Sequence, residues 1–127
     1  MTITLNGTTG VTAPEFVGGG SNLTGLPVKV WVNFNGTGTV AIRASLNVSS
    51  ITDEGTGKYQ VNFTTAFADT NYATVGTCGD PLIGQVNVNL EANNKPSNIL
   101  TTSVRVNTVA VSNAYADCKF VNVIIAR

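Results

Sequence analysis

The sequence predicts an all-β protein with an antiparallel β-sandwich or jelly-roll-like head and a short N-terminal extended stem. Segments in which apolar and polar residues alternate recur about every 8–12 residues, as they do in sandwiches and barrels. Turn-forming Gly, Asn and Asp residues separate these segments. No long segment shows the apolar period of a helix. We therefore expect about eight or nine strands in the head.

Two hairpins are expected between residues 28 and 64. The first turns at residues 35–38 (Asn-Gly-Thr-Gly) and the second at residues 53–57 (Asp-Glu-Gly-Thr-Gly). Glycine adopts the positive φ angles that tight reversals need, and Asn and Asp hydrogen-bond their own backbone there. Side chains alternate faces along a strand, so one stripe is buried. The expected core stripe is Val28, Val30, Val32, Phe34, Val40, Ile42, Val48, Tyr59, Val61 and Phe63, and the outward residues are Asn33, Gln60, Asn62 and Thr64.

Shorter alternating patterns of the same kind predict four further strands after residue 70. Asp80-Pro81 lies between glycines, which predicts a loop at residues 78–84, and residues 112–117 are expected to turn. Residues 92–98 form the most polar loop of the chain. The strands are expected at residues 72–75, at 85–91, at 100–106 with a continuation through Val109 and Val111, and at 119–126.

The last expected strand is apolar on both faces. One face carries Phe120, Ile124 and Ala126 with Asn122, and the other carries Val121, Val123 and Ile125. Such a strand is expected to be covered on both sides. A central strand of a sandwich and a strand at a subunit interface both meet this expectation.

Residues 1–27 are expected to form a separate segment in front of a head domain at residues 28–127. The segment has extended pieces at residues 2–5 and 11–17, with Pro14 interrupting the second, and a glycine-rich break at residues 18–22. It is too short and too rich in glycine to form a core alone. Its apolar side chains must therefore pack either on their own domain or on other copies of the chain. They are Ile3, Leu5, Val11, Phe16, Val17, Leu23 and Leu26.

Composition excludes several classes of function. Only 11% of the 127 residues are charged, and the net charge is zero, so no basic cluster is available for nucleic acid. The longest apolar run, residues 123–126, is far too short to span a membrane. No signal peptide is visible in residues 1–20. We expect a protein made in a cytoplasm.

Histidine is absent, which excludes Ser-His-Asp and Cys-His nucleophiles and histidine metal sites. Carboxylates lie mostly in expected turns, where they hydrogen-bond locally. We therefore expect no catalytic, metal or cofactor site, and no enzyme activity. The two cysteines, Cys78 and Cys118, are expected to be buried free thiols rather than a disulfide in a reducing cytoplasm, although the sequence does not decide whether they pair.

Trp31 lies on the outward face of its expected strand, with Lys29 and Asn33. An outward Trp usually finds cover, either from a neighbouring subunit or from a loop of its own chain. Receptor contacts are expected in loops that combine aromatic and amide side chains. The candidates are Tyr72, Asp80, Asn93, Asn94, Lys95, Asn113 and Tyr115.

Two stretches of the sequence resemble tail fibre proteins of bacteriophages and prophages. Residues 31–43 (WVNFNGTGTVAIR) with residues 47–76 (NVSSITDEGTGKYQVNFTTAFADTNYATVG) look like a module found near the C-termini of such fibres. Residues 2–27 (TITLNGTTGVTAPEFVGGGSNLTGLP) look like the shaft motif that precedes it, which ends in G-x-G-S-x-L-T-G-L. Residues 77–127 match only in general style.

The resemblance implies a homotrimer in which residues 1–27 wind around a threefold axis and serve for trimerisation and attachment to other virion proteins. Its implied interface consists of the apolar residues of that segment together with Trp31. The expected function is a virion fibre or fibre tip on the tail that binds a host glycan or outer-membrane protein. Because the shaft motif follows Met1 directly, a head fibre or capsid decoration protein is the alternative. A monomeric carbohydrate-binding module and a depolymerase are the other functions considered, and 127 residues offer little room for the latter.

Overall fold

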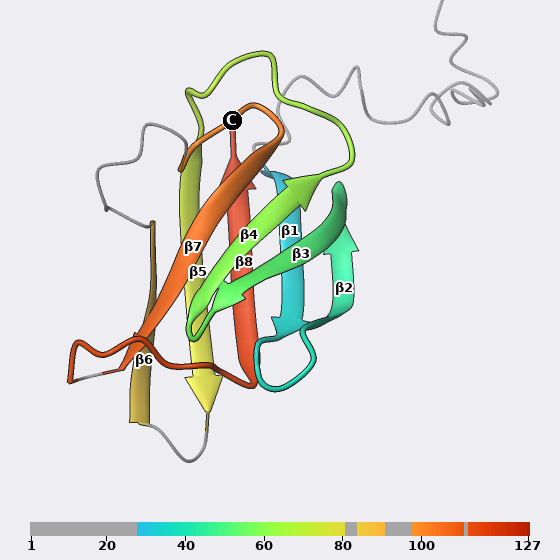
Figure 1. Cartoon of the computed structure of the whole chain (residues 1–127). Coiled ribbons are helices and arrows are strands. Elements are labelled where there is room, and N and C mark those ends of the chain that lie inside the picture. Colours follow the sequence, from blue (N-terminus) through green and yellow to red (C-terminus); the bar gives the residue numbers. More distant parts are fainter. Residues whose placement is uncertain (1–27, 81–83, 91–97, 111) are drawn as a thin grey trace, which may run out of the picture.

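The computed structural model describes residues 28–80, 84–90, 98–110 and 112–127, which contain eight strands (Figure 1). Every strand pair is antiparallel, and no helix occurs in the described ranges. The strands are β1 (Val28–Asn35), β2 (Ala41–Leu46), β3 (Val48–Gly55), β4 (Lys58–Phe63), β5 (Ala73–Asp80), β6 (Gly84–Leu90), β7 (Ser103–Ala110) and β8 (Phe120–Ala126).

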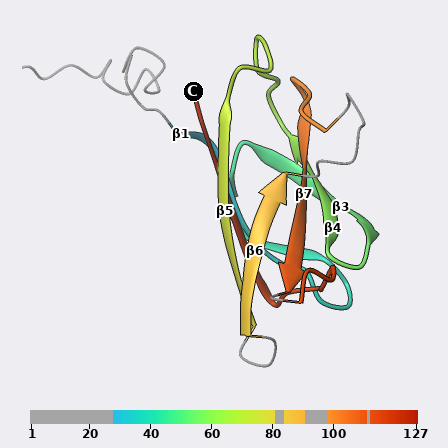
Figure 2. The same cartoon turned by 90° about the vertical axis from the view of Figure 1, so that its left-hand side faces the viewer.

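The strands follow the order β2-β1-β8-β5-β6-β7-β4-β3 in one hydrogen-bonded sheet. This sheet folds over itself into two layers (Figures 1 and 2). We call β2, β1, β8 and β5 the β1 layer, and β7, β4 and β3 the β4 layer; β6 connects them. The all-β antiparallel prediction is confirmed. A jelly roll divides its strands between two sheets, so the jelly-roll-like arrangement is not confirmed.

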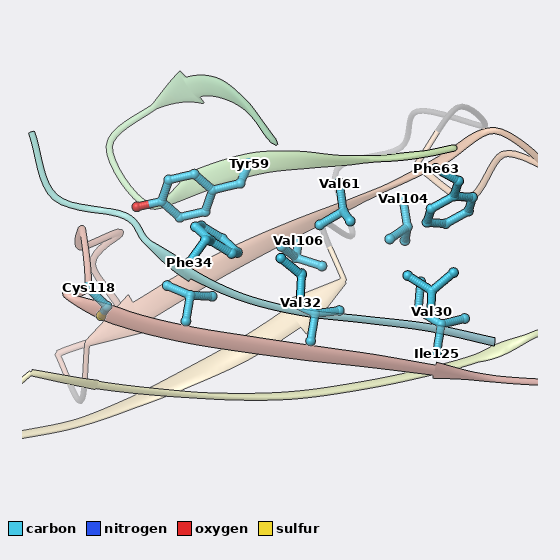
Figure 3. Packing of buried hydrophobic residues seen from close by; sticks show 12 residues of the cluster. Val30, Val32, Phe34, Tyr59, Val61, Phe63, Val104, Val106, Cys118 and Ile125 are labelled. Carbon is cyan, nitrogen blue, oxygen red and sulfur yellow. The ribbon is translucent and has the colours of Figure 1, made fainter. Parts of the chain in front are cut away.

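The hydrophobic core lies between the two layers (Figure 3). Alternate residues of β1 and β8 meet alternate residues of β4 and β7, as the period of two predicts. Phe34 and Tyr59 pack edge to face across the layers, with ring centroids 5.1 Å apart. The buried side chains are Val30, Val32, Phe34, Tyr59, Val61, Phe63, Val104, Val106, Cys118, Val121, Val123 and Ile125. Val28 and Ile42, expected in this stripe, are instead 38% and 36% exposed. A bulge shifts the pairing beside Val28, and Ile42 lies on the edge strand β2, which is exposed along its whole length.

Asn47 forms a corner between the layers. It separates β2 from β3 with a φ of 56°, a left-handed conformation that Asn tolerates better than most residues. Its side-chain amide donates to the Thr65 carbonyl at 3.1 Å, and its side-chain oxygen accepts from the Thr65 N–H at 2.7 Å. The corner thus takes the chain directly from one layer to the other.

The hairpin turns are held at the end of the domain opposite Val28 (Figure 1). The Gly36 N–H donates to the Cys118 carbonyl at 2.9 Å, and the Tyr59 hydroxyl donates to the Gly36 carbonyl at 2.9 Å. The Gly57 N–H donates to the Asp117 carboxylate at 2.6 Å. Burial, and then the neighbouring Asp117 carboxylate, raise the pKa of Tyr59. Both turns are therefore anchored on the segment at residues 112–119.

Both predicted hairpins are confirmed, since β1 pairs with β2 and β3 with β4. The predicted loop at residues 78–84 is wrong at both ends, because β5 continues to Asp80 and β6 begins at Gly84; residues 81–83 lie outside the described residues. Cys78 pairs with Val121 of β8 and Val86 of β6. Pairing of β5 with a strand on each side outweighs the local turn preference of Gly and Asp. The strand predicted at residues 100–106 begins later, at Ser103, because the Leu100 N–H donates to the Ser103 carbonyl in a turn.

Candidate interaction surface

A row of exposed apolar side chains crosses the outer face of the β1 layer. Trp31 of β1 lies opposite Leu46 of β2 and Ile124 of β8, and Ile124 lies opposite Val75 of β5. Directly opposite residues share one face of a sheet. The four side chains are 36% to 63% exposed. With strands about 4.8 Å apart, the row is roughly 14 Å long.

The rows beside this apolar row carry no negative charge. On one side, the Asn33 amide donates to the Asn122 side-chain oxygen at 2.6 Å, and the Asn122 amide donates to the Thr77 hydroxyl at 3.3 Å. On the other side, Ala126 lies opposite both Val28 and Ala73. These amide and methyl groups extend the uncharged surface around the four apolar side chains.

A cation–aromatic contact lies at the far end of the same layer. The Arg43 guanidinium stacks 4.6 Å from the centroid of the Phe120 ring, and it donates to the Lys119 carbonyl at 2.6 Å. Phe120 is nevertheless 44% exposed. The outer face of β8 is thus largely apolar and is not covered by the described part of the chain, so cover on both sides of β8 stays a prediction.

The outer face of the β4 layer has the opposite character. Thr52, Gln60 and Arg105 lie side by side across β3, β4 and β7, in a row comparable to the apolar row of the β1 layer. Arg105 forms an ion pair with Glu54 at 2.8 Å. The Asn62 amide donates to the hydroxyls of Ser50 and Thr52, both at 3.0 Å.

The two outer faces therefore differ in whether they are suited to contact with water. Polar side chains that hydrogen-bond within the layer and to water suit an exposed face. A contiguous apolar row marks a surface that another molecule covers. We name Leu46, Trp31, Ile124 and Val75 the apolar row and treat it as the candidate functional surface.

The predicted interface residues fall into two groups. Trp31 belongs to the apolar row, and its 36% exposure shows that the described part of its own chain does not bury it. The other predicted interface residues, Ile3, Leu5, Val11, Phe16, Val17, Leu23 and Leu26, lie outside the described residues. Sequence reasoning missed Leu46 and Val75, since only the strand register brings them beside Trp31 and Ile124.

The predicted receptor contacts do not form one site. Asn113 and Tyr115 are exposed in the segment after β7, at the end of the domain opposite Val28 (Figure 1). Tyr115 lies beneath the Lys58 ammonium, 4.5 Å from its ring centroid. Asp80 ends β5, whereas Asn93, Asn94 and Lys95 lie outside the described residues.

Tyr72 belongs to an aromatic cluster near the other end of the domain. Its ring stacks on Phe67 at 4.9 Å and meets Phe63 edge to face at 6.1 Å. Its hydroxyl donates to the carbonyls of Leu100 and Ser103 at 2.9 and 3.2 Å. These contacts give Tyr72 a structural role, and its participation in receptor binding stays a prediction.

The pKa of Tyr72 also predicts how the stability of the domain depends on pH. Burial raises its pKa from 10.0 to about 12. Above pH 10 the unfolded chain releases this proton while the folded chain retains it, so the contribution of Tyr72 to the free energy of unfolding should be lost between about pH 10 and 12. Urea denaturation along a pH series measures this loss as a fall in the free energy of unfolding. The fall should be shallower in Tyr72→Phe, and an equally steep fall would contradict the prediction.

No grouping of three or more His, Cys, Asp or Glu side chains suited to a metal occurs in the described ranges. Within the same ranges, no helix long and apolar enough to cross a membrane was found. No protein-family model, curated protein or solved structure matches this chain.

Proposed function

We propose that this protein is a bacteriophage virion component, a homotrimeric tail fibre or fibre-tip protein that attaches the particle to its host. The proposal combines the resemblance of residues 2–27, 31–43 and 47–76 to tail fibres with the contrast between the two outer faces. The apolar row of the β1 layer carries the proposal. A binding protein that works as an isolated monomer has no need of such a row, whereas a subunit of a trimer covers it with its neighbours.

The positions of β1 and of the turns at opposite ends of the domain support the same function. β1 begins at Val28, so a stem formed by residues 1–27 joins the head at that end. The hairpin turn at residues 35–38 and the segment with Asn113 and Tyr115 lie at the opposite end (Figure 1). A head attached in this way presents its turns away from the particle, where a host glycan or outer-membrane protein would be met. The proposed activity is binding, without turnover.

The solution mass tests the proposed assembly. We expect light scattering to give three times the chain mass of 13.2 kDa over a range of protein concentrations. A mass of 13.2 kDa would contradict the trimer and favour a monomeric carbohydrate-binding module instead. Binding of the labelled protein to bacterial cells, with no release of oligosaccharide from the cell surface, tests the attachment function separately.

A head fibre or capsid decoration protein would have the same apolar row and the same mass. Antibody labelling of virions in the electron microscope distinguishes the two locations. Label on the tail supports the proposal, whereas label on the capsid supports the alternative.

A further inference from the structure

The two cysteines of this chain, Cys78 and Cys118, lie in the same part of the folded domain. β5 and β8 are neighbours, with Gly79 opposite Phe120 and Cys78 opposite Val121. This register places Cys78 near the start of β8, which Cys118 precedes by two residues. Cys118 is fully buried, and Cys78 is partly buried against the same core cluster. The fold therefore brings near each other two thiols that lie 40 positions apart in the sequence.

The surroundings of the two thiols agree with this placement. The Cys118 thiol donates to the Ala116 carbonyl at 3.8 Å, and the nearby Cys118 contributes, after burial, to the raised pKa of Cys78. A disulfide requires the sulfurs to approach to about 2 Å. The strand register and the shared core cluster place the two side chains near each other, so that side-chain rotation with a local backbone shift would bring the sulfurs together. The chain has no third cysteine that could compete for either sulfur.

We propose that Cys78 and Cys118 form an intrachain disulfide when the folded protein meets a disulfide oxidant of low molecular mass, such as oxidised glutathione. The proposal is independent of the proposed fibre function. A protein made under reducing conditions would keep both thiols, and one transferred to oxidising surroundings would acquire the cross-link.

The reaction proceeds by two exchanges. The Cys78 thiolate, on the more accessible sulfur, attacks one sulfur of oxidised glutathione and releases a glutathione thiolate, which takes up a proton. The Cys118 thiolate then attacks the Cys78 sulfur of this mixed disulfide and releases the second glutathione. Two protein thiols are oxidised and one glutathione disulfide is reduced to two thiols. Burial, with a smaller contribution from Cys118, raises the pKa of Cys78 to about 12, so the first exchange is slow at neutral pH and accelerates at higher pH.

The cross-link is expected to stabilise the domain. It would join β5 to the segment that anchors both hairpin turns, and it would close a long loop in the unfolded chain. Cross-links of this kind raise the free energy of unfolding by restricting the unfolded state. We expect the oxidised protein to melt about 10 °C or more above the reduced protein.

Intact mass spectrometry tests the proposal. The purified full chain is incubated with oxidised glutathione at pH 8.5, and a second sample is refolded from urea in a glutathione redox buffer, which removes the barrier of burial. Any remaining thiols are alkylated in denaturant. We expect a loss of about 2 Da, from the two thiol hydrogens, with no alkylation, no retained glutathione and no covalent dimer in a non-reducing gel.

The variant Cys118→Ser is the matched control, because it keeps Cys78 and removes the second nucleophile. It should stop at a single glutathione adduct. Two alkylated thiols in both wild-type samples would overturn the proposal, as would a glutathione adduct that persists in the wild type. Intermolecular disulfides in place of the intrachain cross-link would also overturn it.

Discussion

Gly57→Ala is expected to destabilise the domain by about 3 kcal/mol or more. Gly57 has a φ of +64°, and a Cβ atom there would lie 2.6 Å from the Thr108 carbonyl oxygen and 2.7 Å from the Ala116 nitrogen. Both neighbours are backbone atoms and cannot rotate away. The shift would disturb two hydrogen bonds: Thr108 N–H to the Gly57 carbonyl at 2.8 Å, and Gly57 N–H to Asp117 at 2.6 Å.

Gly38→Ala provides the matched control, since Gly38 has nearly the same φ of +62° and no atom within 4 Å of the added Cβ. Only the backbone conformation then opposes the substitution, at a cost of about 1–2 kcal/mol. Urea denaturation at one protein concentration measures both variants, because stability depends on concentration if the chains associate. Equal losses in the two variants would mean that the close approach of Gly57 to Thr108 and Ala116 contributes nothing.

Ile124→Asp is expected to dissociate the proposed trimer while the domain stays folded. Ile124 is 42% exposed on the outer face of the central strand β8, so its replacement removes no side chain from the core. At a subunit interface, the change loses the burial of an isoleucine, about 1.5–3 kcal/mol, and leaves a carboxylate without a partner. Dissociation constants should rise by roughly 100-fold or more.

Light scattering along a dilution series measures this effect, and circular dichroism checks the fold. Gln60→Asp is the control, because it also places a carboxylate on the outer face of an internal strand, β4, but in the polar layer; we expect its mass to equal that of the wild type. Ile124→Thr, which keeps the β-branched shape, covers the case in which Ile124→Asp does not fold. An unchanged mass in both Ile124 variants would show that the apolar row is not the subunit interface.

The core could be predicted from the sequence because it depends on local alternation. Val30, Val32 and Phe34 face inward as their spacing of two requires, and so do Tyr59 and Val61. The turns at residues 35–38 and 53–57 carry glycines where positive φ angles occur. These features need only a few neighbouring residues to be recognised.

The candidate surface could be predicted only in part, because it depends on pairing between distant strands. The outward position of Trp31 and the second apolar face of β8 were visible in the sequence. Leu46 and Val75 join them only through the order β2-β1-β8-β5, which no local pattern specifies. Pairing with the distant strand β8 and with β6 likewise extends β5 through Cys78 to Asp80, although Gly and Asp favour a turn there.

The pairing of β1 has a mechanical consequence for the proposed attachment function. Val28 lies opposite Ala126 at one end of β1, and Phe34 lies opposite Val121 near the other. A pull between the Val28 end and the turn at residues 35–38 would act on the two ends of the same strand. The covalent backbone of β1, which is already extended, would carry this force without breaking its hydrogen bonds to β2 and β8, so the domain should resist tension along this axis better than tension that peels the edge strand β2 from β1.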